Sequence, residues 1–347
     1  MVLLGVCNPL LDVVAEVPRS LIDEYGLPHG GAVLANEHQM SLFPILEKKY
    51  ACKYLAGGCG QNTIRVYQAL CNNPGESKFL GCIGQDKEGA QLKELLESQG
   101  IIPIYKTSAT KPTGTCMVLV TDKERCVCTN LGASVDIDEA FVEAKWKEVE
   151  ACDAVYCTGF LLSSSAAVLL KLARHCQSSG KTFACNLSAE FLMHEFKAEY
   201  LEMLQRANVC CGNKEEATKF AELNGMDTTG SVGDTAAQIL DLMLKGLDEG
   251  ANKQKMVVVT QGADPVIVAS RTPSGTISIG SYPVPEVPME KIVDLNGAGD
   301  AFVGGLLFGL LHNIGIDAAI ELGNWCSGVV IRRSGFSFDA TGCPYIK

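Results

Sequence analysis

Short apolar runs alternate with helix-patterned stretches along most of this 347-residue chain. The apolar runs are rich in residues that favour β-structure, which is typical of buried strands, and they cover residues 79–83, 154–157, 182–185 and 255–259. The stretches between them repeat apolar residues at helical spacing, for example at 91–96 and 166–175. This alternation predicts an α/β fold with a mainly parallel sheet and helices on both faces.

Two stretches break the alternation. Residues 12–36 contain a strand-like run at 13–17, and residues 115–129 contain two strand-like runs around a polar turn, which predicts a hairpin. We interpret both as parts of a small β lid inserted into the α/β domain. The predicted large domain then comprises residues 1–11, 37–111 and 132–347, and the discontinuous lid comprises 12–36 and 112–131. Residues 248–253 are expected to form a surface loop.

The amino-acid composition and charge argue against several classes of protein. The formal net charge is −11 and no run of Lys or Arg stands out, which argues against a nucleic-acid partner. The longest apolar run, 301–311, is too short to cross a bilayer, and residues 1–6 lack the features of a signal peptide. The 16 cysteines are scattered through apolar runs, so we expect reduced core thiols in a cytoplasmic protein, with a nuclear pool left open.

A glycine turn before an apolar helix is a candidate phosphate site. Gly297, Ala298 and Gly299 precede Asp300, and glycines let successive N–H groups converge on one point. The start of the following helix would add its own N–H groups and dipole. Asp300 could then accept the proton of an attacking hydroxyl. The alternative is an Asp that caps a helix after a glycine turn. A dinucleotide fingerprint fits less well, because Phe302 occupies its third small position.

Three further segments could complete a two-substrate site. Asn213 and Glu216 stand three apart at a predicted helix start, where they could hold magnesium-bound water or phosphate, although this spacing also suits a capping box. Asp12 follows the first strand and could accept hydrogen bonds from two adjacent ribose hydroxyls, or it could be a turn residue. Gly57 and Gly58 precede a predicted helix at 63–70 and allow close approach of a ligand, although they could simply form a flexible loop.

Taken in order, these segments resemble the ribokinase-like, or PfkB, carbohydrate kinase family, and within it the members that phosphorylate adenosine. The two most specific matches are Asn8-Pro9-Leu10-Leu11-Asp12 and Asn296-Gly297-Ala298-Gly299-Asp300. Shorter matches follow the family's order over nearly the whole chain, at residues 57–62, 81–87, 112–116, 186–189, 212–216, 260–262 and 331–333. The resemblance implies a three-layer ribokinase-like sandwich with a small β-sheet lid.

The resemblance also implies a reaction and a set of roles. The expected reaction moves the ATP γ-phosphate to the 5′-hydroxyl of adenosine, giving AMP and ADP, a purine-salvage step that uses Mg²⁺. Asp300 is the expected base, and the expected anion hole is Gly297, Ala298 and Gly299. The expected sugar-binding residues are Asn8, Asp12, Gly57, Gly58, Asn62 and Asn296. Glu216 is expected to hold Mg²⁺ through water, and the expected ATP-binding residues are Arg125, Asn213, Thr260, Gly262 and Asn324. Adenine contacts are expected from Leu34, Leu131 and Phe160, for which core packing is the alternative.

The chain departs from the family pattern at three places. Leu295 replaces a small polar residue and offers no side-chain oxygen, which puts a monovalent-cation site there in doubt. Cys59-Gly60 and Ala32 also replace polar residues near the expected substrate. Two alternatives stay open: a kinase of this fold acting on another nucleoside or a sugar, and a non-catalytic nucleoside-binding protein. The expected partners are adenosine and ATP, without nucleic acid or membrane, and the expected state is a monomer.

Overall fold

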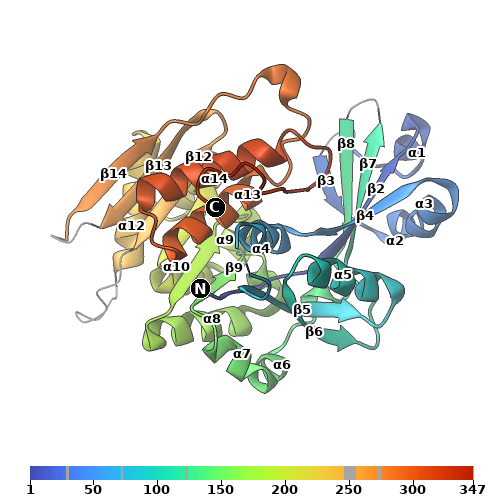
Figure 1. Cartoon of the computed structure of the whole chain (residues 1–347), viewed down its shortest axis with the longest axis horizontal. Helices are drawn as coiled ribbons and strands as arrows, with labels where there is room; N and C mark the ends of the chain where they lie inside the picture. The colour runs from blue at the N-terminus through green and yellow to red at the C-terminus, as the bar shows by residue number, and fades with distance from the viewer. Residues whose placement is uncertain (29–30, 72, 122–123, 246–254, 272–274, 347) are drawn as a thin grey trace.

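The computed structural model describes residues 1–28, 31–71, 73–121, 124–245, 255–271 and 275–346. Its larger sheet has nine strands, of which the seven from β12 to β6 run parallel, while β13 and β14 are antiparallel (Figure 1). The spatial order is β14 (Ile277–Tyr282), β13 (Asp264–Arg271), β12 (Met256–Gln261), β11 (Val209–Asn213), β10 (Thr182–Asn186), β9 (Ala154–Cys157), β1 (Leu3–Val6), β5 (Ser77–Gly84) and β6 (Ile102–Ser108). The predicted mainly parallel sheet is confirmed.

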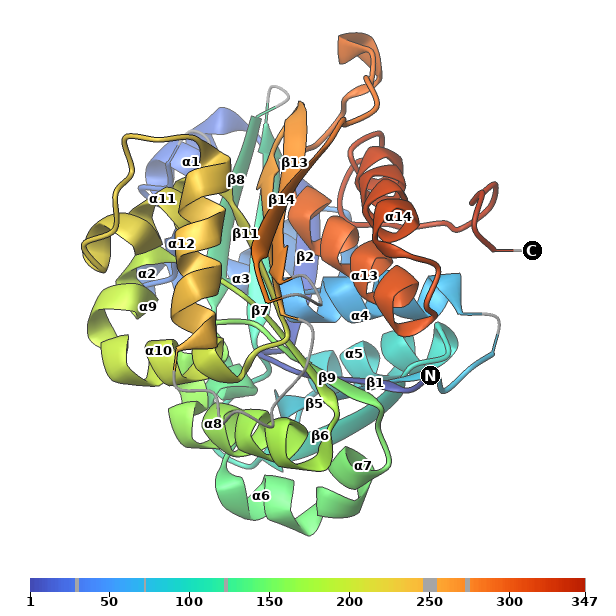
Figure 2. The ribbon, with the colours of Figure 1, turned by 90° about the vertical axis from the view of Figure 1, so that its left-hand side faces the viewer.

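Helices cover both faces of this sheet, which makes three layers (Figure 2). One face packs against α4 (Cys59–Leu70), α5 (Lys87–Ser98), α13 (Ala298–Leu311) and α14 (Ile316–Val330). The other packs against α6 (Glu139–Ala144), α7 (Trp146–Glu150), α8 (Leu161–Ser179), α9 (Glu190–Glu195), α10 (Lys197–Arg206), α11 (Lys214–Leu223) and α12 (Val232–Leu244). Alternate strand residues supply the two cores, as Leu3 and Leu4 of β1 show. Among the described residues no helix is both long and apolar enough to cross a membrane.

The second sheet has five strands and stands beside the first (Figure 1). Its order is β3 (Gly31–Leu34), β8 (Glu124–Asn130), β7 (Thr115–Thr121), β2 (Leu10–Glu16) and β4 (Cys52–Gly57). The predicted hairpin is present as the antiparallel pair β7–β8. A separate core joins one face of the sheet to the segment that carries α1 (Arg19–Glu24), α2 (Glu37–Met40) and α3 (Phe43–Lys49).

The small sheet extends beyond the predicted lid. We predicted that residues 37–111 belong to the large domain, but β4 pairs with β2 along its whole length, from Cys52 opposite Ala15 to Gly57 opposite Leu10. Pairing between strands that are distant in sequence has no local signature, so the boundary was misplaced. The predicted loop at 248–253 lies outside the described residues. Two short 3₁₀ helices, η1 (Gly132–Val135) and η2 (Met289–Lys291), complete the fold.

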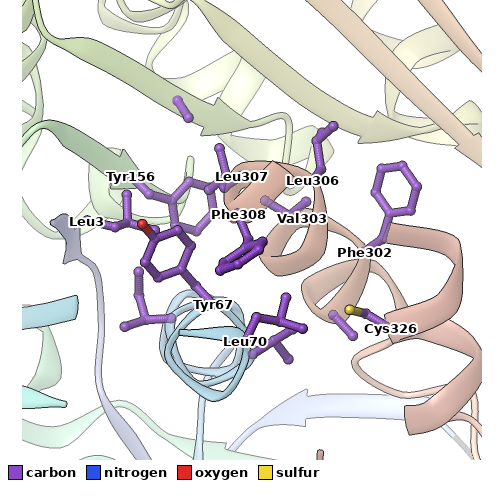
Figure 3. Close-up of a cluster of buried hydrophobic side chains, with 14 of the residues drawn as sticks. Leu3, Tyr67, Leu70, Tyr156, Phe302, Val303, Leu306, Leu307, Phe308 and Cys326 are labelled. Atoms are coloured by element: carbon purple, nitrogen blue, oxygen red, sulfur yellow. The ribbon is translucent and has the colours of Figure 1, made fainter. Parts of the chain in front are cut away.

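Helices α4 and α13 approach each other closely, and this packing determines how their first turns are placed. A Cβ added at Gly304 would lie 2.7 Å from the Thr63 carbonyl oxygen, so only glycine permits this contact. The Tyr67 ring meets the Phe308 ring edge-on at a centroid distance of 5.9 Å (Figure 3). Because Asp300 lies one helical turn before Gly304, this packing brings the start of α13 against the start of α4.

Candidate active site

Two pockets meet at Asp300. The first, which we call the lid-side pocket, has a volume of about 210 Å³ and lies between the small sheet and the starts of α4 and α13. The second, the strand-end pocket, has a volume of about 120 Å³ and lies at the carboxyl ends of β10, β11 and β12. Asp300 lines both. In parallel α/β sheets, ligands bind at the carboxyl edge, where the strand-end pocket lies. The fold thus places one pocket on each side of the Asp300 carboxylate.

Asp300 is the third residue of α13, after the N-cap Gly297. Its Oδ2 accepts a hydrogen bond from Asn62 Nδ2 at 3.0 Å, and its backbone carbonyl accepts one from Thr63 Oγ1 at 3.2 Å. The alternative of a capping Asp is therefore wrong, because Gly297 occupies the cap. Burial raises the pKa of Asp300 from 3.8 to about 7, and the bond from Asn62 opposes that rise. Such a carboxylate can take a proton near neutral pH.

The predicted glycine turn leaves the backbone at the start of α13 accessible to a ligand. Gly297 has φ of 76°, a left-handed conformation, and a Cβ there would lie 2.3 Å from the Phe336 ring. At Gly299 an added Cβ would meet no atom within 4 Å, so a ligand can reach the backbone. The Ala298 carbonyl accepts a bond from Ser327 Oγ at 2.7 Å, which holds the turn in place. N–H groups at a helix start attract phosphate.

The lid-side pocket brings together the predicted sugar-binding residues Asp12, Gly58, Asn62 and Asn296. A Cβ at Gly57 would lie 1.9 Å from Asp12 Oδ1, so the carboxylate rests directly on the glycine backbone. Burial raises the pKa of Asp12 from 3.8 to about 7, the Arg65 charge lowers it, and the charge of Asp300 raises it. Asp12 therefore lies in the same pocket as Asp300, close enough for the charge of Asp300 to disfavour its ionisation.

The strand-end pocket contains the predicted phosphate group of residues, Asn213, Glu216 and Thr260, together with Gly299. Asn213 and Glu216 do form a capping box: Glu216 N donates to Asn213 Oδ1 at 2.8 Å, and Asn213 N donates to Glu216 Oε2 at 3.0 Å. The capping-box interpretation is therefore confirmed, and the role of these residues in holding phosphate or magnesium-bound water stays a prediction. Burial, with a contribution from the charge of Asp300, raises the pKa of Glu216 from 4.5 to about 7.

A divalent cation fits the strand-end pocket if it arrives with phosphate and water. Within the described ranges, no three His, Cys, Asp or Glu side chains gather into a direct metal site. Glu216 and Asp300 line the same pocket, and the negative charge of Asp300 disfavours ionisation of Glu216. A cation placed between them would relieve that repulsion, and Mg²⁺ commonly keeps several waters and few protein ligands.

Arg125 lies in an unexpected place. The resemblance implied a contact with ATP, but Arg125 lines the lid-side pocket. There it forms an ion pair with Asp294 and donates to Ser334 Oγ at 2.9 Å. This ion pair ties strand β8 of the small sheet to the segment before α13.

Several predicted site residues line neither pocket. Asn8 donates to the Ser134 carbonyl at 3.3 Å, and Asn324 in α14 donates to the Pro283 carbonyl at 3.4 Å. Four more lie on the exposed edge strand β3, before η1, before α8 and in the turn after β12, and they are Leu34, Leu131, Phe160 and Gly262. Their predicted ligand contacts stay predictions.

The pocket walls also contain residues that the sequence interpretation missed. Val14, Cys116, Val118 and Val127 line the lid-side pocket from β2, β7 and β8, and the two-residue alternation of these strands could have revealed them. Phe336 lines the same pocket from an irregular segment that carries no such pattern. At the strand-end pocket, the missed residues are Asn186, Cys211, Gly212, Phe302 and Val303.

Known proteins resemble this chain over nearly its full length. A family model described as pfkB family carbohydrate kinase matches residues 34–341. Adenosine kinase 1 of Arabidopsis thaliana is 36% identical over 339 residues, which cover 97% of this chain and 96% of the relative. Adenosine kinase of Schizosaccharomyces pombe is 36% identical over 342 residues, which cover 96% and 95%.

Solved structures agree with these relatives. Anopheles gambiae adenosine kinase in complex with P1,P4-di(adenosine-5) tetraphosphate superposes with a TM-score of 0.85 at 35% identity, covering 97% of this chain and 98% of that one. Schistosoma mansoni adenosine kinase with adenosine in an occluded loop conformation gives 0.86 at 30% identity, covering 97% and 96%. With its two sheets, its shared carboxylate and these full-length likenesses, the chain belongs to the pfkB family of carbohydrate kinases.

Proposed function

We propose that this protein is an ATP-dependent nucleoside kinase that phosphorylates the 5′-hydroxyl of adenosine. The observation that carries the proposal is the position of Asp300, which lines both pockets and so faces both substrates at once. The relatives and solved structures that cover nearly the whole chain are adenosine kinases, which supports adenosine as the acceptor.

The acceptor would occupy the lid-side pocket. Asp12 accepts hydrogen bonds from the two ribose hydroxyls, as a carboxylate beside a glycine backbone can. The apolar side chains of Val14, Val118 and Val127 line the same pocket and suit a flat base. The 5′-hydroxyl then points to Asp300, which orients it and takes its proton.

The donor would place its phosphates in the strand-end pocket. The 5′-oxygen forms a bond to the γ-phosphorus, the bond from that phosphorus to the β,γ-bridging oxygen breaks, and the proton passes to Asp300. The first turn of α13 holds the negative charge that develops on the transferring group. A bound Mg²⁺ would neutralise phosphate charge, and Glu216 with Asn213 would hold it through water.

The direct test measures AMP formed from adenosine and Mg-ATP by the wild-type protein and by Asp300→Ala. We expect turnover to fall by at least about 10³-fold in the variant. Wild-type turnover in Asp300→Ala would refute the assigned base. Adenosine binding without turnover by the wild-type protein would instead indicate a non-catalytic nucleoside-binding protein.

A substrate panel tests the acceptor. Comparing kcat/KM for adenosine, inosine, guanosine, cytidine and free ribose ranks the acceptors on one scale. Adenosine is expected to lead. If another nucleoside or ribose leads, the reaction class stands and the acceptor is corrected.

We further propose that the enzyme acts as a monomer. The residues given roles in the reaction, Asp12, Glu216 and Asp300, all line pockets of the same chain, which supports this proposal. Sedimentation at catalytic concentrations checks this, and a stable dimer would contradict it.

A further inference from the structure

Arg65 is a buried cation in the middle of α4 that lines neither pocket. Its side chain is 8% exposed. Its Nη1 donates to the Ala56 carbonyl and, at 3.3 Å, to Asn62 Oδ1, while its Nε donates to Gln99 Oε1 at 2.8 Å. The guanidinium also lies 5.2 Å from the centre of the Phe336 ring. Burying a charge is costly. A buried cation with this many specific contacts is therefore a candidate for a functional role.

The contact with Asn62 determines which way its amide group points. A guanidinium is a donor only, so Asn62 must turn its oxygen toward Arg65. The nitrogen then points the other way, and it donates to Asp300 Oδ2 at 3.0 Å. If the amide rotated by half a turn, its oxygen would face the Asp300 carboxylate and repel it. Arg65 therefore excludes the orientation that would harm the base.

We propose that Arg65 is a positioning residue for phosphoryl transfer, acting through Asn62 on Asp300. The proposal rests on the proposed kinase function. Arg65 touches neither substrate pocket, and its effect passes along the hydrogen bonds Gln99–Arg65–Asn62–Asp300. The last of these hydrogen bonds, from Asn62 to Asp300, orients and holds the carboxylate that receives the hydroxyl proton.

Arg65 has a second, separable influence. Its positive charge favours the ionised form of Asp12, the residue proposed to hold the ribose. A lysine at position 65 keeps the charge but lacks the guanidinium fork, which holds two acceptors in a fixed geometry. Arg65→Lys should therefore keep the adenosine KM close to that of the wild type and still lower kcat. Arg65→Met should raise KM and lower kcat.

The test is a double-mutant cycle with Arg65→Met and Asn62→Ala, read as kcat at saturating adenosine and Mg-ATP. Each single variant is expected to lose about tenfold or more, the typical effect of a lost hydrogen bond to a charged group. The double variant should be no slower than Asn62→Ala alone, because the effect of Arg65 on kcat passes only through Asn62, whereas its effect on Asp12 changes KM. If the two losses multiply instead, the proposal is overturned. The same cycle is measured with Arg65→Lys in case Arg65→Met folds poorly.

A matched control separates positioning from general damage. Lys255 is another buried cation, 3% exposed at the amino end of β12, far along its strand from Thr260 at the pocket. Lys255→Met should lower the melting temperature and leave kcat and KM unchanged. A fall in kcat that matches that of Arg65→Met would mean that removing any buried charge slows the enzyme, and the inference would fail.

A second readout does not depend on the substrate. The free energies of unfolding of the same four proteins form their own cycle, which reports the Arg65–Asn62 contact directly. Non-additive effects of the two substitutions, both on kcat and on the free energy of unfolding, support the proposal. Coupling in unfolding with multiplying losses in kcat would show a purely structural contact. Absence of AMP formation by the wild-type protein would refute the proposed function, and an additive unfolding cycle would refute the contact itself.

Discussion

Replacing Asp300 by Asn should stabilise the protein while abolishing its activity. Burial raises the pKa of this carboxyl from 3.8 to about 7. A group with a raised folded-state pKa contributes stability that is fully present below its unfolded pKa and is lost as the pH rises through its folded pKa. The wild-type protein therefore loses stability progressively between pH 3.8 and about pH 7. Asn carries no charge at any of these pH values and can still accept the hydrogen bond from Asn62.

The size of the effect follows from the pKa shift. A rise from 3.8 to about 7 corresponds to roughly 4 kcal/mol at 1.36 kcal/mol per unit. Asp300 lines two open pockets, so water screens part of its charge, and we expect about half of that, roughly 2 kcal/mol, at pH 8. By pH 5 less than half of this loss of stability has occurred, so the advantage of Asp300→Asn over the wild type should be below about 1 kcal/mol.

The assay is equilibrium unfolding in urea at pH 5 and pH 8, at one ionic strength, for the wild type and Asp300→Asn. Glu94→Gln, which changes an exposed carboxyl on α5, serves as the matched control and should show no pH-dependent difference. An advantage of Asp300→Asn that does not grow between pH 5 and pH 8 would refute the reasoning. So would a wild type that is the more stable protein at pH 8.

Four further predictions test other parts of the site. The wild-type kcat/KM should fall about tenfold per pH unit below about pH 7, because Asp300 of the free enzyme must be ionised to accept the proton, and a pH–rate profile checks this. Asp12→Asn should raise the KM for adenosine about 10- to 100-fold and leave that for 2′,3′-dideoxyadenosine unchanged; equal losses for both would exclude ribose recognition. Gly297→Ala should lower the free energy of unfolding by about 1–3 kcal/mol in urea titrations, since the residue has φ of 76° and faces the Phe336 ring. Arg125→Met should raise the adenosine KM about three- to tenfold by releasing the small sheet from Asp294; a rise in the ATP KM alone would restore the role first expected for this residue.

Local patterns correctly predicted the two helix starts that line the pockets. The glycine turn before Asp300 and the Asn213–Glu216 spacing each describe consecutive residues at a helix start, and local chemistry determines such structures. The parallel sheet was predictable for the same reason, since each strand and helix has its own period. The sequence pattern also indicated Asp12 as a candidate hydrogen-bond acceptor, although only the structure shows Gly57 beneath it.

Contacts between residues far apart in the chain could not be predicted from local patterns. Residues 52–57 were placed in the large domain with residues 37–111, and their pairing with β2 could not be predicted because strand pairing joins residues far apart in the chain. Arg65 went unnoticed because a charged residue on a helix usually faces solvent, and nothing near it in sequence shows that it is buried against Phe336. Arg125 was identified as a site residue, but its pairing with Asp294, 169 positions away, could not be anticipated.

The meeting of two separate pockets at one carboxylate constrains the course of the reaction. In the proposed reaction each substrate occupies its own pocket, so both bind together and the phosphoryl group has no need to rest on the protein between them. Initial-velocity plots should intersect, as they do for ternary-complex mechanisms. A single in-line displacement inverts the configuration at phosphorus. A stereochemically labelled γ-thiophosphate should therefore reach the nucleoside with its handedness reversed.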